Sequence, residues 1–490
     1  MALGIAVCSI ALITSCTRLL SQNTDTAARP NLDAGDGSNT PTDGIAPTDG
    51  IGPPTDGIRT DGIRTDGIRT DGLVGDTLQP SKRARGIYDT SFATGGVHSE
   101  SGYLNGNYFN AVLVAPLGQV YVAGALQVNS SDWGDIILQR LHPNGSLDVG
   151  FNFTGTRIVN FTPFELAVGL HITGQGKLRL GGARTVQEDP LVMGFNDDGT
   201  TDTDFGSAGI VLKGIAGENY PRAMAVDPVD GAFYIVGDDY GDTPYAVKFT
   251  AAGAVDSSFS GDGHLVLPGL TYGEAIDVQV DANRRVVIVG EIKPAGATDD
   301  KAAILWRLNP NGSLDTSFGN GGVLILDDVF DTGVDESAKG LVLDQADMLY
   351  VTGSASGGGV SDLVVWKLDE TGGPVSSFGT GGVYRATDLA SAGGSGGGSA
   401  LKLDASGDLV IVGSGSNGSN MDIVLLRLRR DGILDSSFGD GGKVIVSDVF
   451  GEPADDYARA LDFGLGGSIY VAGMAMAPDG YRDAILIKVD

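Results

Sequence analysis

The sequence has few of the residues that build disulfides, metal centres and catalytic triads. It contains two cysteines, Cys8 and Cys16, and four histidines in 490 residues. Both cysteines precede the repetitive part of the chain, so that part has no disulfide and no cysteine metal site. The histidines show no ligand-like spacing, which predicts no metal site and no catalytic residues of the zinc or Ser-His-Asp type; they are His98, His142, His171 and His264.

Positive charge is also scarce. The chain has 32 basic residues against 62 acidic ones, a net charge of −30. A chain this acidic repels phosphate backbones, which excludes DNA and RNA as partners. An acidic surface keeps an exported protein soluble or collects cations. We therefore expect no cofactor, with calcium as the open alternative.

No apolar run is long enough to span a membrane. The first one, residues 2–13, has the length of a signal-peptide core. It leads into Ile13-Thr14-Ser15-Cys16, which resembles a bacterial lipobox, although no Lys or Arg precedes the apolar run. The resemblance implies that residues 1–16 are a signal peptide, that Cys16 is lipidated, and that the protein reaches the outer membrane or cell surface. The alternative is an ordinary secretory signal and a periplasmic or secreted protein.

Residues 17–86 contain no periodic apolar pattern. Thr-Asp-Gly units begin at Thr42, Thr48, Thr55, Thr60, Thr65 and Thr70, with prolines between the first ones. Glycine in every unit prevents a packed core, and the alternating ligands of a calcium loop are missing. We predict a disordered linker of roughly 70 residues that spans about 45 Å.

Glycine is abundant, at 77 residues, and much of it belongs to a repeat. The repeat is clearest at Leu314-Asp315-Thr316-Ser317-Phe318-Gly319-Asn320-Gly321-Gly322. Its phenylalanine recurs seven times at intervals of 54 to 60 residues, at Phe92, Phe151, Phe205, Phe259, Phe318, Phe378 and Phe438. A repeat of this length determines the fold and must be recognised first.

Each repeat contains four short apolar runs separated by turn residues, which predicts four antiparallel strands. The second run always ends in glycine, at Gly124, Gly182, Gly237, Gly290, Gly353, Gly413 and Gly473. We interpret this glycine as a strand end that needs dihedral angles favourable to glycine.

Seven four-stranded units form either a closed propeller or an open solenoid. The repetitive part begins with only the last strand of a repeat, after Phe92, and ends at Asp490 after a third strand. The two ends complete one unit and leave no exposed sheet edge. We therefore predict an all-β, seven-bladed β-propeller over residues 87–490, a monomer whose ring is closed by N- and C-terminal strands that share one blade.

The signature Leu-Asp-x-Ser-Phe-Gly-x-Gly-Gly, with a basic third strand before it (Arg307, Lys367, Arg427), resembles the delta-60 repeat of bacterial propeller-like proteins. The resemblance covers residues 87–490 and implies a propeller, without any catalytic residue. The glycine after Phe is replaced by Ala93, Asn152 and Ser260, where we expect a different turn, and Leu-Asp is replaced by Pro374-Val375. The recurring Asp and Ser are interpreted as turn formers.

The blades differ mainly in the loops between the second and third strands and between blades, which share one face of a propeller. We call it the long-loop face, and the opposite one the short-turn face. Because variable loops on a rigid scaffold carry function, we expect the binding face here, around Trp133, Tyr240, Asp328, Asp335, Asp455 and Asp456.

Two functions follow from these loops. The first is a membrane-tethered, non-enzymatic binding, adhesion or scaffold protein for an unknown protein or glycan, in contact with the membrane only through its lipid. The alternative is a periplasmic or surface hydrolase or lyase that uses loop carboxylates.

Overall fold

The computed structural model describes residues 86–490 except 103–106, 128–133, 162–163, 185–188, 240–242, 269–271, 295–300, 328–333 and 358. Cys16, the linker, Trp133, Tyr240 and Asp328 lie outside the described residues. The predicted end of the signal peptide at Cys16 lies outside them as well.

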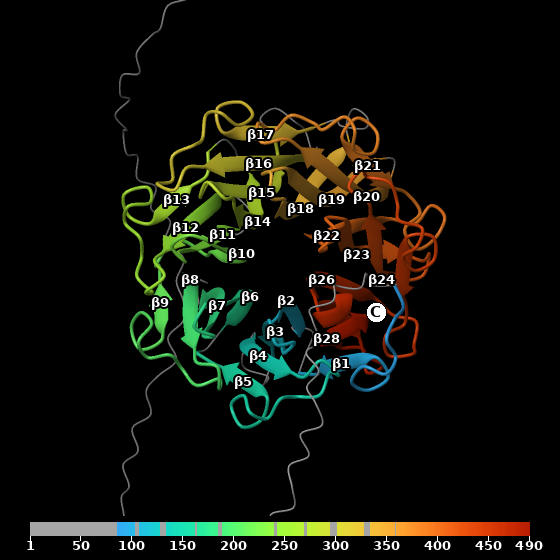
Figure 1. Ribbon diagram of the computed structural model, residues 1–490, viewed down its shortest axis with the longest axis horizontal. Coiled ribbons are helices and arrows are strands. Elements are labelled where there is room, and N and C mark those ends of the chain that lie inside the picture. Colours follow the sequence, from blue (N-terminus) through green and yellow to red (C-terminus); the bar gives the residue numbers. More distant parts are fainter. Residues whose placement is uncertain are drawn as a thin grey trace, which may run out of the picture. The chain divides into compact units, whose positions relative to one another are not determined.

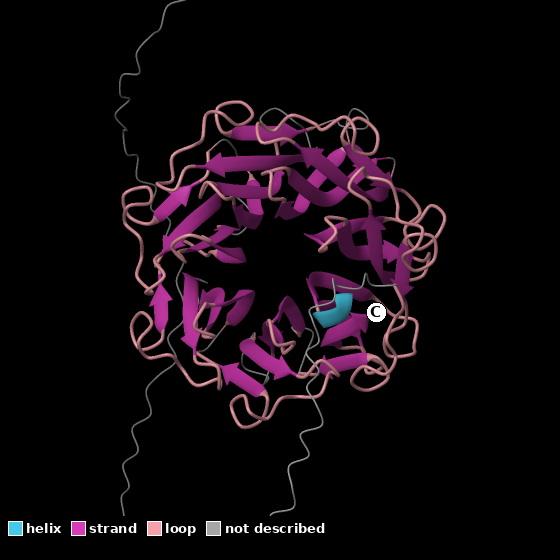
Figure 2. Cartoon of the chain, in the orientation of Figure 1, coloured by secondary structure: helices cyan, strands magenta, loops and turns pink. Residues whose placement is uncertain are grey.

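The described residues form 28 strands in seven antiparallel sheets of four strands each, arranged as a ring (Figure 1). Within this part of the chain the only helical segment is the 3-10 turn η1 (Leu465–Gly467), drawn in cyan in Figure 2. The predicted all-β, seven-bladed propeller is confirmed.

Each blade presents its first strand to the centre of the ring and its fourth to the rim (Figure 1). Blades 1 to 7 are numbered from their inner strands, which are β2 (Tyr108–Val114), β6 (Glu165–Ile172), β10 (Tyr220–Val226), β14 (Gly273–Val280), β18 (Asp335–Leu343), β22 (Gly396–Leu403) and β26 (Asp456–Phe463). The second strands are β3 (Val120–Leu126), β7 (Leu178–Arg184), β11 (Phe233–Asp238), β15 (Val286–Ile292), β19 (Leu349–Gly357), β23 (Leu409–Ser416) and β27 (Ile469–Met476).

The third and fourth strands complete each sheet. The third strands are β4 (Asp135–Leu141), β8 (Asp189–Phe195), β12 (Pro244–Phe249), β16 (Ala302–Leu308), β20 (Val360–Leu368), β24 (Met421–Leu428) and β28 (Arg482–Val489). The outer strands of blades 1 to 6 are β5 (Thr156–Val159), β9 (Ile210–Leu212), β13 (His264–Val266), β17 (Val323–Leu326), β21 (Val383–Ala386) and β25 (Lys443–Val446), and blade 7 takes β1 (Val97–Glu100).

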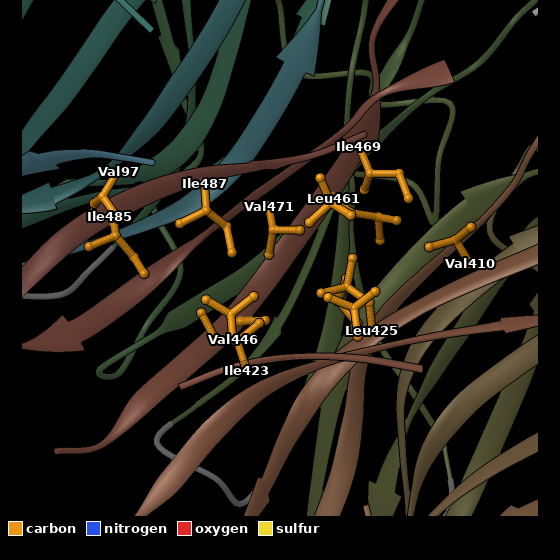
Figure 3. Packing of buried hydrophobic residues seen from close by; sticks show 14 of the residues in the cluster. Val97, Val410, Ile423, Leu425, Val446, Leu461, Ile469, Val471, Ile485 and Ile487 are labelled. Atoms are coloured by element: carbon orange, nitrogen blue, oxygen red, sulfur yellow. The ribbon is translucent and has the colours of Figure 1, made fainter. Parts of the chain in front are cut away.

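Blade 7 closes the ring with strands from both ends of the propeller. β1 pairs with β28 in the register Val97↔Ile487, and the backbones of Ile87 and Asp490 exchange hydrogen bonds of 2.9 and 2.8 Å. Val97 also joins the apolar core between blades 6 and 7, where it lies near Ile485 (Figure 3). The predicted closure by the segment after Phe92 is confirmed, and it covers the edge of β28.

The repeat signature joins the turn of one blade to the strand before it. Asp315 Oδ1 accepts from the amide and hydroxyl of Ser317, at 3.1 and 2.7 Å, while its Oδ2 lies 2.8 Å from Arg307 Nε. The Arg307 guanidinium in turn lies 4.6 Å from the ring centroid of buried Phe318. The interpretation of the recurring Asp and Ser as turn formers is confirmed.

The residue directly after the phenylalanine keeps a left-handed conformation where its glycine is replaced. Ala93, Asn152 and Ser260 adopt φ of 46°, 47° and 54°, close to the 51° of Gly319. The expectation of a different turn is wrong at Ala93, where the next positive φ falls on Gly95 as it falls on Gly321 in the standard turn. It is confirmed after Asn152 and Ser260, because there the positive φ moves forward by one residue, to Phe153 (62°) and Gly261 (93°). A left-handed residue costs of order 1–2 kcal/mol without glycine, which the rest of the signature offsets.

The glycine of the second strand has another role than the one expected. All seven glycines lie inside their strands, and none of them has a positive φ. A Cβ atom there would lie 1.7–2.2 Å from a carbonyl oxygen of the inner strand, opposite a β-bulge. Close approach of two backbones therefore requires the glycine, and the interpretation as a strand end is wrong.

The substitution Gly353→Ala tests this contact, because its Cβ would lie 1.7 Å from Ser337 O. We expect the free energy of unfolding to fall by about 3 kcal/mol, since backbone cannot move aside as a side chain can. Denaturant unfolding measures the change. Gly174→Ala is the control, because no atom lies within 4 Å of its Cβ position; equal stability of the two variants would contradict the role given to Gly353.

Candidate functional site

The bulges of the inner strands place one residue of every blade around a central cavity. The register of each inner strand skips one residue at its third, fourth or fifth position: Asn110, Val168, Arg222, Ile276, Lys339, Ser399 and Arg459. All seven line a single cavity of about 340 Å³. Each inner strand begins at the long-loop face, so these residues lie toward that end of the ring.

Three of the seven bulge residues are cations. The Arg222 side chain is neutralised by two carboxylates: its Nε contacts Asp238, and its Nη2 lies 3.0 Å from Glu274 Oε2. It also lies 5.1 Å from the ring centroid of Tyr220. Arg222 is therefore held in place and its charge is largely balanced.

The other two cations have no carboxylate within 4 Å among the described residues. Arg459 Nη1 donates to Asn110 Oδ1 at 3.0 Å, and its guanidinium lies 4.5 Å from the Tyr108 ring centroid. Lys339 is exposed and lies on the inner strand of blade 5. Of the described residues that line the cavity, none carries a carboxylate.

The arrangement can bind an anionic group. Two uncompensated cations converge with the hydroxyl of Ser399 and the amide of Asn110, in a chain whose net charge is −30. Charge-assisted hydrogen bonds in a partly enclosed site are stronger than those in bulk water. The cavity is small, at the lower end of the range for small-molecule sites.

The bulge residues were missed by the sequence analysis. In six of the seven repeats the bulge residue is followed by Ala or Gly, so an alignment of the inner strands shows one variable position beside a small one. This pattern indicates that the residue before the small one varies between repeats. It does not indicate that this residue faces the centre, because only the bulge changes the direction of its side chain.

Two of the predicted binding residues occupy equivalent positions, four residues before the bulge. Asp335 Oδ1 accepts from the amide of Lys301 at 2.8 Å, and Asp455 Oδ1 accepts from the amide of Met421 at 2.9 Å. Ser395 does the same for Ser361 in the blade between them, at 3.2 Å. In each case the amide belongs to the start of the third strand in the preceding blade, so these side chains connect neighbouring blades.

Asp456, the third described residue of the predicted face, is buried, with 1% of its surface exposed. Its Oδ2 accepts from the amide of Val449 at 3.0 Å. The pKa of Asp456 is raised to about 7, mainly by burial and in addition by the neighbouring Asp422, Asp448 and Asp455, while the hydrogen bond from Val449 acts in the opposite direction. A pKa near 7 suits a general acid, but so little exposed surface keeps this carboxyl from substrate.

The described residues contain no group of three or more His, Cys, Asp or Glu arranged to hold a metal ion. No helix in the same part of the chain has both the length and the apolar character to cross a bilayer.

Fold and cavity define a repeat-built β-propeller with a cationic centre. A family model described as "Domain of unknown function (DUF5122) beta-propeller" matches residues 118–151, 282–318 and 405–438. Each match runs from a turn before or within the second strand to the signature phenylalanine, in blades 1, 4 and 6. The match covers less than half of the chain and supports a family of bacterial propeller repeats. None of the curated proteins compared with the chain matches it.

Several solved structures resemble the fold. Drosophila Semaphorin 1b, extracellular domains 1-2, is 11% identical over 84% of this chain and 88% of its own, with a TM-score of 0.47. The polysaccharide lyase Uly1 is 11% identical over 82% and 92%, with a TM-score of 0.45. The β-propeller domain of the Trilobed protease from Pyrococcus furiosus is 10% identical over 79% and 96%, with a TM-score of 0.43. At these values none of them bears on the activity of this chain.

Buried carboxyl groups make the stability depend on pH. The pKa values of Asp277 and Asp456 are raised to about 7 and that of Asp483 to about 6, mainly by burial. Unfolding lets these groups ionise at pH values where the folded protein keeps them protonated. Stability therefore falls as pH rises from about 4 to about 7.

We expect a higher melting temperature at pH 5 than at pH 8, and Asp456→Asn should reduce the difference. In the variant, residue 456 no longer carries a carboxyl group whose ionisation destabilises the folded protein at pH 8. The melting temperature of the variant at pH 8 should therefore exceed the wild-type value by about one to three degrees. The exposed Asp440→Asn is the control. The same pH profile in all three proteins would contradict this account.

Proposed function

We propose that the protein is an exported, membrane-tethered and non-enzymatic β-propeller that binds its ligand at the long-loop end of the central cavity. The ligand is a glycan or protein that carries an anionic group. The observation that carries the proposal is the pair of uncompensated cations, Lys339 and Arg459, in a cavity lined by one residue of every blade.

In this proposal, the central cavity binds the anionic group of the ligand and the surrounding long-loop face binds the rest of it. Asp335 and Asp455 hold the blades in register, while the long loops that contain Trp133 and Tyr240 would supply outer contacts. Aromatic and arginine side chains contribute most of the binding energy in many interfaces. A rigid ring with variable loops serves recognition better than catalysis, because the described residues that line the cavity include no carboxylate and no histidine to act as a general base.

The binding proposal is tested with the full chain carrying Cys16→Ser and arrays of acidic and neutral glycans and peptides. We expect the bound probes to share a carboxylate or sulfate group. The double substitution Lys339→Gln and Arg459→Gln should weaken their binding by about tenfold or more, because each removes a charge-assisted hydrogen bond. Arg429→Gln, which removes the same charge from an exposed site on the short-turn face, should leave binding unchanged. The proposal is refuted if the probes that bind are neutral. It is also refuted if the parent chain, the double variant and Arg429→Gln bind the probes equally well.

The tether is tested separately through Cys16. A radiolabelled fatty acid should enter the wild-type chain and not Cys16→Ser, because the cysteine thiol is the group of a lipobox to which the lipid is attached. Cys8→Ser is the matched control and should keep the label, as the wild-type chain does. Equal labelling of wild type and Cys16→Ser, or a mature N-terminus elsewhere, would contradict lipidation.

A further inference from the structure

The signature carboxylate has a cationic partner in most blades. In blades 1, 3, 4, 6 and 7 the basic residue of the third strand lies 2.8–3.0 Å from it: Arg140–Asp148, Lys248–Asp256, Arg307–Asp315, Arg427–Asp435 and Lys488–Asp89. In blade 2 the cation is replaced by Gly194, and Asp202 pairs with Arg179 and Lys177 instead. The charge of the carboxylate is balanced in all six blades.

Blade 5 keeps the cation and lacks the carboxylate. Val375 stands at the position of the signature aspartate, and Lys367 Nζ has no carboxylate within 4 Å among the described residues. The ammonium group lies 4.8 Å from the ring centroid of Tyr350 and 5.8 Å from that of Phe378, and it donates to Arg430 O at 3.5 Å. Lys367 is thus held on aromatic rings as in the other blades, without their counter-ion.

The missing counter-ion has an electrostatic consequence. Burial lowers the pKa of Lys367, and the nearby Arg430 lowers it further, although Asp344 acts in the opposite direction. A partly desolvated ammonium group is stabilised by any anion that comes within hydrogen-bonding distance. In the other blades the chain supplies that anion itself.

Lys367 opens into a cavity of about 590 Å³ between blades 5 and 6, on the short-turn face. Arg430 lines the same cavity and also has no carboxylate within 4 Å in the described part of the chain; its guanidinium donates to Ser406 O. The volume is within the range of small-molecule sites. The cavity therefore presents two cations that no carboxylate of the chain neutralises at close range.

Two carboxylates on the cavity wall are already partly used. Asp344 Oδ1 accepts from the amides of Ala346 and Met348, at 2.8 and 3.1 Å. Asp404 Oδ1 caps the equivalent turn of blade 6 in the same way. Their Oδ2 atoms leave acceptor capacity for hydroxyl groups, apart from a 3.4 Å contact of Asp344 Oδ2 with the Tyr350 hydroxyl.

We propose that this cavity is a second ligand site, which binds a hydroxylated carboxylic acid of the size and chemistry of a uronic acid. Lys367 and Arg430 bind the carboxylate, and Asp344 and Asp404 accept hydrogen bonds from the hydroxyl groups. The site is separate from the central cavity and does not depend on the function proposed for it.

The experiment uses Val375→Asp, which restores the signature pair and leaves Lys367 in place. The full chain with Cys16→Ser, Lys339→Gln and Arg459→Gln is titrated calorimetrically with D-glucuronate, so that the central cavity does not contribute. We expect millimolar binding that Val375→Asp weakens by about tenfold or more, because the new carboxylate occupies the ammonium group. Lys367→Gln should weaken binding to the same extent.

Stability separates a ligand site from a purely structural lysine. Val375→Asp should raise the melting temperature while it weakens binding, whereas a general loss of folding would lower both the melting temperature and the affinity. D-Glucose and acetate are the control probes, and each should bind more weakly than D-glucuronate because each lacks one half of the ligand. The proposal is overturned by D-glucuronate binding that Val375→Asp leaves unchanged, by no binding at all, or by acetate binding as tightly as D-glucuronate.

Discussion

The contact between a glycine of the second strand and a carbonyl oxygen of the inner strand is the constraint on which the ring depends. It recurs in every blade, opposite a bulge at the same register position. The bulge bends the inner strand and turns one side chain toward the centre. Packing seven blades around an axis and lining that axis with one residue each are therefore consequences of the same backbone geometry.

The signature adds a second constraint at the short-turn face, where in most blades a cation, a carboxylate and a phenylalanine hold the turn against its strand. Because the repeats share these contacts, a blade that departs from them shows where the chain has other uses. Lys367 in blade 5 keeps its aromatic support without a carboxylate partner. At the bulge position of the inner strands, the fold accepts side chains as different as Lys339 and Arg459 on the one hand and Val168 and Ile276 on the other.

The binding face expected from the sequence stays a prediction. The cavity cations lie at the long-loop end of the inner strands. The residues chosen there have other roles, because Asp335 and Asp455 accept backbone amides of the preceding blade. A carboxylate in a variable loop looks the same in sequence whether it faces a ligand or a neighbouring amide, and only the packing of blades distinguishes the two.

The sequence by itself determined the repeat, the four strands of each blade and the closure of the ring, because these follow from local patterns and from the incomplete repeats at Phe92 and Asp490. It also showed that glycine is required in every second strand, but not why. The tertiary structure alone decided that this glycine admits a bulge, and that Lys339 and Arg459, 120 residues apart, face one cavity. Such side chains meet only when the blades close around a common axis, which no local pattern records.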